Sequence, residues 1–200
     1  SASILTGDEL DGNHFVGGSI SAGRKTATEI WDDMKIRVAA VSDGTGGTVV
    51  VAALDAYGLA NNDVRVIRAR LEEYAALHNI VSINICSLHQ HSVIDTFGMN
   101  GDLTDALVFN PLKNLAGFGN TRNGKNPAFM ENLFQVAAAT IKQACENTES
   151  GRLYFGAADA AEYVRDKRPP YVNDGFLNRL RFDPDDPQSR ETMMLFWYAH

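Results

Sequence analysis

A run of alternating apolar residues that ends in two histidines constrains this chain more than any other stretch. Val81, Ile83 and Ile85 recur at every second position, which is the period of a half-buried β-strand. His89 and His91, called the histidine pair below, continue the same parity beyond the apolar part. If the extended conformation persists through the pair, both imidazoles leave the same side of the strand. A metal ion or a substrate would meet them there.

The rest of the chain predicts an α/β fold with mixed sheets flanked by helices. Alternating or β-branched residues predict strands at 35–42, 48–54, 153–157, 176–182 and 192–199. Apolar residues at steps of three and four predict one helix that begins at Asn61 or Asn62 and runs to about Leu77. Asn126 and Pro127 supply the cap and the first-turn proline of a second, longer helix.

Length and charge narrow the class of protein. We expect residues 1–200 to form a single domain, because 200 residues can bury a substantial core. The net charge of −7 argues against a nucleic-acid partner, since phosphate binding depends on clustered Lys and Arg. No apolar run approaches the roughly 20 residues of a membrane-spanning helix.

The cysteines and the C-terminal residues add two further expectations. Cys86 and Cys145 fall in a predicted strand and a predicted helix, so we expect buried free thiols and no disulfide. The last eight residues, 193–200, resemble a core strand that stops at its final residue. We therefore expect the domain to be truncated at its C-terminal end and to form the front part of a longer protein.

The histidine pair permits a structural and a functional interpretation. In the structural one, the imidazoles only bond to loop carbonyls at the edge of a sheet. In the functional one they bind Zn²⁺, for which neutral imidazole is the commonest ligand and which takes three protein ligands in catalytic sites. Asp55 follows the preceding predicted strand and His200 ends the last one, so each is a candidate for a further ligand. Ser87 and Ser92 offer a rival nucleophile, but no glycines of a nucleophile elbow flank them.

Four segments, in order, resemble the N-terminal part of the neutral/alkaline non-lysosomal ceramidase family. They are residues 32–58, residues 82–92 with the His-x-His-Ser motif, the helix from Pro127 with residues 151–156, and residues 180–200. The resemblance implies that His89 and His200 bind zinc and that His91 either supports the metal ligands as a neighbour or polarises the substrate. It also implies a catalytic arginine, either Arg165 or Arg168, in the basic loop 164–170, where Lys167 is an alternative for the same position. The family's remaining ligands, a Glu and a Tyr, come later than this chain reaches.

The implied function is zinc-dependent amide hydrolysis by a metal-activated water. The substrate would be a lipid or another small N-acyl compound, and the protein would be extracellular or on the cell surface. Preorganised donors such as His91 or the basic loop would stabilise the oxyanion. Two alternatives remain open: a non-catalytic ligand-binding protein on the same scaffold, and a zinc hydrolase that acts on a non-lipid amide or ester. The acyl chain, the head group and the oligomeric state do not follow from the sequence.

Two departures from the family pattern fall beside the histidine pair. Gln90 replaces a small hydroxyl residue between the histidines, and residues 92–95 replace the usual Gly and Pro. The apolar residues from Val93 onward, with 107–109, would form either a lipid trough or core. We expect the long loop at residues 95–126 to form a wall or lid of the site, because irregular loops of this length are more often functional than idle. The histidine pair therefore supports the prediction of a metal site more strongly than the prediction of a lipid substrate.

Overall fold

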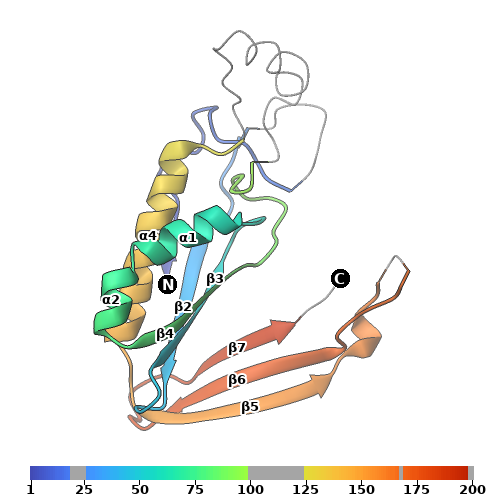
Figure 1. Cartoon of the computed structure of the whole chain (residues 1–200). Helices are drawn as coiled ribbons and strands as arrows, with labels where there is room; N and C mark the ends of the chain where they lie inside the picture. Colours follow the sequence, from blue (N-terminus) through green and yellow to red (C-terminus); the bar gives the residue numbers. More distant parts are fainter. Residues whose placement is uncertain (19–25, 99–123, 167–168, 198–200) are drawn as a thin grey trace. The chain divides into compact units, whose positions relative to one another are not determined.

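The computed structural model describes residues 1–18, 26–98, 124–166 and 169–197 (Figure 1). The chain divides into two compact units, Ser1–Asn147 and Thr148–His200, and each unit is described by itself. That residues 1–200 act as one domain stays a prediction. Within the described ranges, no helix is long and apolar enough to cross a lipid bilayer.

Unit 1 is built on a four-stranded sheet of order β1-β2-β3-β4. Its strands are β1 (Ala2–Ser3), β2 (Lys35–Ser42), β3 (Thr48–Leu54) and β4 (Ile80–Ser87). β2 and β3 form the predicted antiparallel hairpin, whereas β3 and β4 run parallel. Ile36 faces Leu54 across the hairpin, and both side chains are fully buried. The alternation of apolar residues thus places one face of the sheet in the core.

The connection between β3 and β4 contains two helices where the sequence predicted one. α1 spans Asn61–Ala69 and α2 spans Glu72–Leu77. The helix breaks because the Leu71 N–H donates to the carbonyl of Arg68, three residues back, at 3.0 Å, and ends the i to i−4 pattern. Leu71 is fully buried at this break, whereas Leu77, at the end of the predicted apolar stripe, is 81% exposed.

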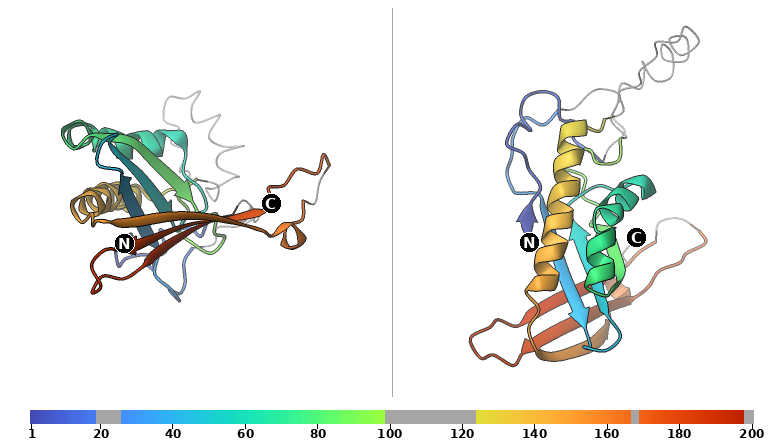
Figure 2. Two further views of the ribbon diagram at one scale, coloured as in Figure 1. Left: turned by 90° about the horizontal axis from the view of Figure 1, so that it is seen from below. Right: turned by 60° about the vertical axis from the view of Figure 1, so that its left-hand side comes forward.

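The long helix α4 (Pro127–Glu146) begins as predicted, with Asn126 as its cap. The Asn126 carboxamide oxygen accepts from the amides of Ala128 and Phe129 at 2.9 and 3.2 Å. α4 packs against β2 and α1, and the three helices lie on the same side of the sheet (Figure 2). The apolar residues that α4 buries in the core are Phe129, Met130, Leu133, Ala137, Ala138 and Ile141.

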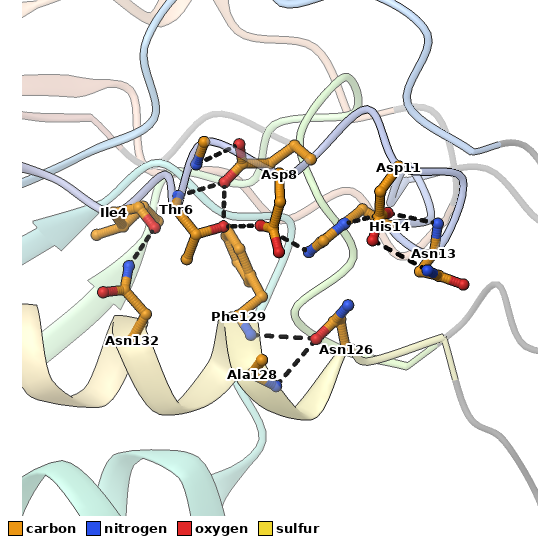
Figure 3. Close-up of polar contacts among 12 residues, drawn as sticks. Ile4, Thr6, Asp8, Asp11, Asn13, His14, Asn126, Ala128, Phe129 and Asn132 are labelled. Atoms are coloured by element: carbon orange, nitrogen blue, oxygen red, sulfur yellow. Dashed lines mark hydrogen bonds and ion pairs between the residues drawn. The ribbon is translucent and has the colours of Figure 1, made fainter.

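Polar contacts fasten the N-terminal segment beside the first turns of α4 (Figure 3). The Asn132 side chain donates to the carbonyl of Ile4 at 2.9 Å. The buried imidazole of His14 has Nδ1 3.0 Å from Asp11 and Nε2 3.9 Å from Asp8. Hydrogen bonds from Asn13, with a smaller contribution from His14, hold the pKa of Asp11 below its ordinary value. These contacts fix the segment that continues to Gly17 and Gly18 at the candidate site.

Unit 2 is a three-stranded antiparallel sheet of order β5-β6-β7. β5 (Gly151–Asp159) and β6 (Phe176–Pro184) extend the predicted strands by two residues at one or both ends, and β7 is Thr192–Trp197. A single 3₁₀ turn, η2 (Ala161–Tyr163), follows β5. Between β6 and β7 the Asp186 carboxylate accepts from the Gln188 amide at 2.9 Å, which is the chemistry of a turn.

Candidate metal centre

The histidine pair lies where two parallel strands end. Leu54 at the end of β3 pairs with Ser87 at the end of β4, so the carboxyl ends of both strands share one edge of the sheet. The chain after β4 stays beside the chain after β3, since Leu88 N–H donates to the Leu54 carbonyl at 2.9 Å and Gln90 N–H to that of Ala56 at 3.2 Å. Such an edge is a common place for ligand sites in α/β folds.

The predicted extended conformation does not persist through the pair. β4 ends at Ser87, and His89 has a φ of 57° in the left-handed region, which a residue with a side chain seldom adopts. The prediction that strand parity aligns the two imidazoles is therefore wrong. A turn brings them together instead, and the Nε2 atoms of His89 and His91 lie 3.3 Å apart.

One hydrogen bond decides the tautomer of His89. Its Nδ1 lies 3.0 Å from the backbone carbonyl oxygen of Tyr57. Because a carbonyl only accepts, Nδ1 carries the proton and donates, and Nε2 keeps its lone pair. A carbonyl partner on the far nitrogen is the usual second contact of a metal-binding histidine. Both histidines are exposed, so a ligand can reach Nε2.

Packing holds both rings in place. The Tyr57 ring lies 4.7 Å from the His89 ring and 5.1 Å, edge to face, from the His91 ring. Gly18, with a φ of 101°, contacts His91 on its backbone, and a Cβ at Gly18 would lie 2.5 Å from the His91 Cα. Gly17 fixes the adjoining chain through its N–H, which donates to the Val93 carbonyl at 2.7 Å. The pair is thus held between β3 and the N-terminal segment.

Asp55 reaches the same edge of the sheet but is engaged by other groups. Asp55 is 5% exposed. Each of its two carboxylate oxygens accepts from the same guanidinium nitrogen of Arg37 at 2.9 Å. The carboxylate also accepts from the Lys35 amide at 2.9 Å and from the Gln90 side chain at 3.4 Å. Gln90 therefore ties the loop of the histidine pair to β2 and β3. Arg37, which stands between Ile36 and Val38 in β2, could have indicated a partner acid from the sequence.

Of the predicted site residues, the structure brings His89 and His91 together. Arg165 is an exposed residue of unit 2, and Arg168 and His200 lie outside the described residues. The greater part of the predicted lid, residues 99–123, is also outside them. In the described part of the chain, no group of three or more His, Cys, Asp or Glu side chains is arranged to hold a metal ion. The roles predicted for all five residues stay predictions.

An open cavity of about 1150 Å³ adjoins the histidine pair within unit 1. Its lining includes His91, Gln90 and Asp55, and the segment 26–35 on another side. The volume lies just above the roughly 300–1,000 Å³ of typical small-molecule sites. Ile30 and Trp31 expose apolar surface along this segment, at 46% and 92%, among several carboxylates.

The residues after the pair are core. Val93 and Ile94 are 7% and 5% exposed. Ile94 forms an isolated antiparallel β-bridge with Val16. Of the two interpretations of these apolar residues, the structure favours core over lipid trough. Phe97 is 46% exposed and packs edge to face on Tyr57, and residues 107–109 lie outside the described ranges.

The cysteines stand apart from the site. Cys86 and Cys145 are free, as predicted, although Cys86 is exposed and Cys145 half-buried. Burial of part of each side chain raises the pKa of both thiols above the ordinary value.

Comparison with known proteins identifies the fold. No protein-family model matches the chain, and no curated protein matches its sequence. The crystal structure of neutral ceramidase from Pseudomonas aeruginosa matches 98% of this chain with a TM-score of 0.64 and 17% identity. A structure of ceramidase complexed with C2 matches 92% with a TM-score of 0.58, also at 17% identity. The chain spans 30% and 28% of the lengths of these proteins. The predicted resemblance is confirmed for the fold: this is a divergent α/β chain folded like part of a neutral ceramidase.

Proposed function

We propose that this chain supplies part of the active site of a zinc-dependent amidohydrolase. The ceramidase-like fold makes hydrolysis of an amide the leading candidate reaction. One observation carries the proposal: the hydrogen bond from His89 Nδ1 to the Tyr57 carbonyl leaves the Nε2 atom of His89 without a proton, so its lone pair can bind a metal ion or accept from His91 Nε2, which lies 3.3 Å away. The two nitrogens face each other at the edge of the cavity.

The proposal assigns the following roles to residues of the chain. His89 binds the metal, with its ring held by the carbonyl and the ring of Tyr57. The cavity beside His91 takes the substrate, and Ile30 and Trp31 offer apolar contact to an acyl group. His200 as a further ligand and Arg165 or Arg168 as the oxyanion donor stay predictions. So does location outside the cell.

A bound zinc ion would supply hydroxide near neutral pH, because it lowers the pKa of its water to about 7, and would polarise the scissile carbonyl. The chain's own contribution is to orient the ligands before the ion arrives. An imidazole that exchanges between its two tautomers has a lone pair on Nε2 only part of the time. The hydrogen bond to the Tyr57 carbonyl keeps the proton of His89 on Nδ1, so that the lone pair on Nε2 can bind a metal ion.

The proposal is tested on the full-length protein. We expect about one zinc per chain after purification without chelator, hydrolysis of an N-acyl amide, loss of that activity with a chelator and its return with Zn²⁺. His89→Ala should lose both metal and activity, whereas His78→Ala, an exposed histidine stacked on Tyr74, should retain both. Zinc well below one per chain, together with full activity in His89→Ala, would rule out the proposal. Zinc binding without hydrolysis of any amide would favour the ligand-binding alternative.

A further inference from the structure

The segment 26–35 forms one wall of the cavity beside the histidine pair, and three neighbouring side chains in it suit a positively charged ligand. We propose that this wall selects amides that carry an organic ammonium group, which binds over the ring of Trp31 beside Glu29 and Asp32. The inference rests on the proposed amide hydrolysis and names a class of substrate for it. The sequence predicted a lipid or another N-acyl compound, without a preference for charge.

Trp31 offers an exposed aromatic ring on this wall. It is 92% exposed and lines the cavity, although an indole ring is one of the most favourable side chains to bury. The ring N–H donates to the Glu29 carboxylate, which holds the ring beside a negative charge. Tryptophan is the best of the aromatic side chains for binding a cation over its face. Trp31 therefore gives an ammonium group a ring and a carboxylate side by side.

The other acids that line the cavity already have partners within the protein. Asp55 bonds with Arg37 at 2.9 Å, and the carboxylate of Asp33 lies 3.7 Å from the Lys35 amine. Glu9 is fully buried, and its carboxylate accepts from backbone amides of the N-terminal segment. These three carboxylates are therefore compensated without a ligand.

Glu29 and Asp32 are exposed acids whose charges are not compensated in this way. Within the described residues neither carboxylate forms an ion pair, and their hydrogen-bond donors are the neutral ring of Trp31 and the Asp33 amide. Two such charges beside an aromatic ring attract a cation. Among the described side chains these acids do not belong to a group that could hold a metal ion, so the cation that fits here is an organic ammonium.

The cavity places the ammonium site and the histidine pair beside one substrate. Trp31 and His91 line the same cavity, whose volume is about 1150 Å³. An amide beside His91 and an ammonium group at Trp31 share this space when a short alkyl spacer joins them. The spacer offers methylene groups to the ring, so the apolar contact of Trp31 and its contact with a cation are compatible. A neutral end group lacks the electrostatic part of this contact and binds less well.

Hydrolysis of three matched amides by the full-length protein tests the inference. The N-dodecanoyl amides of 1,3-diaminopropane, 3-aminopropanol and β-alanine share an acyl chain and differ in an end group that is cationic, neutral or anionic. We expect kcat/KM to be about 2–5-fold higher for the cationic amide than for the neutral one, as an exposed cation–π contact provides. The anionic amide should be the poorest substrate, because Glu29 and Asp32 repel it.

Variants of the wall show whether these side chains cause the preference. In Trp31→Ala, and in the double variant Glu29→Gln with Asp32→Asn, the ratio of kcat/KM for the cationic and neutral amides should fall to about one. Glu73→Gln, which removes an exposed carboxylate from α2, is the matched control and should keep the wild-type ratio. All the replaced side chains are exposed, so circular dichroism should show the wild-type fold.

A ligand without an amide separates the inference from the proposed function. Saturation-transfer NMR with hexyltrimethylammonium detects binding without hydrolysis, and the signal should fall in Trp31→Ala and in the double variant. A wild-type protein that hydrolyses the cationic and neutral amides equally well, or variants that keep its preference, would overturn the inference and leave the amidohydrolase standing. Ammonium binding that the variants lose, with no amide hydrolysed, would support the ammonium site and count against the proposed function. Absence of both hydrolysis and ammonium binding would remove both.

Discussion

Replacing Asp55 tests how the edge of the sheet that carries the histidine pair is stabilised. The buried carboxylate accepts from the Lys35 amide and from Arg37. Asp55→Ala leaves the part-buried Lys35 N–H without this acceptor, which costs about 1–3 kcal/mol. The Arg37 side chain is 51% exposed and regains water, so loss of its ion pair adds only up to about 1 kcal/mol. We expect a total loss of about 1–4 kcal/mol in the free energy of unfolding.

Thermal unfolding followed by far-ultraviolet circular dichroism measures this loss, because α1, α2 and α4 all lie in unit 1. For a chain of this size, each kcal/mol lowers the melting temperature by about 2–4 °C, so Asp55→Ala should melt about 2–16 °C below the wild type. Asp55→Asn keeps an acceptor oxygen and should lose about 1 kcal/mol. Glu73→Gln, an exposed carboxylate on α2, is the control and should melt within about 2 °C of the wild type. If Asp55→Ala melts no lower than Glu73→Gln, Asp55 does not anchor the site.

Three further predictions concern the ring that packs on the pair, the cap of α4 and the free thiols. Tyr57→Ala should weaken zinc binding by the full-length protein about 10–100-fold, as loss of a supporting contact does, while Tyr57→Phe keeps the ring and should bind like the wild type; equal weakening in both would show that packing on the imidazoles is not the cause. Asn126→Ala should lower the free energy of unfolding by about 0.5–2 kcal/mol in a urea titration, because two amides at the start of α4 lose their acceptor; no shift of the midpoint would contradict this. Cys86 and Cys145 should react with iodoacetamide more slowly at neutral pH than a free thiol, since burial raises the pKa of both and leaves less thiolate; their rates should keep rising with pH above the point where the free thiol levels off, and early levelling would refute the cause.

The order of elements followed from local chemistry. The hairpin at 35–54 and the start of α4 were predictable, because β-branched alternation and a cap followed by proline act over a few residues. The break between α1 and α2 was not, because it depends on Leu71 being fully buried at the point where the helix ends. A stripe of apolar residues gives the period of a helix but not the place where packing interrupts it.

The candidate site also has features that local sequence predicts and features that depend on packing. That two histidines follow a strand of alternating apolar residues, and that an acid follows its neighbouring strand, could be read from the order and period of the residues alone. The hydrogen bond of the Asp55 carboxylate with Arg37, and the Tyr57 carbonyl that sets the tautomer of His89, became visible in the folded chain. The tertiary structure also placed the two imidazole nitrogens 3.3 Å apart through a left-handed residue and not through strand parity. The Asp55–Arg37 and Tyr57–His89 contacts join segments that are distant in the sequence, and no local pattern encodes which partner a side chain meets across a sheet.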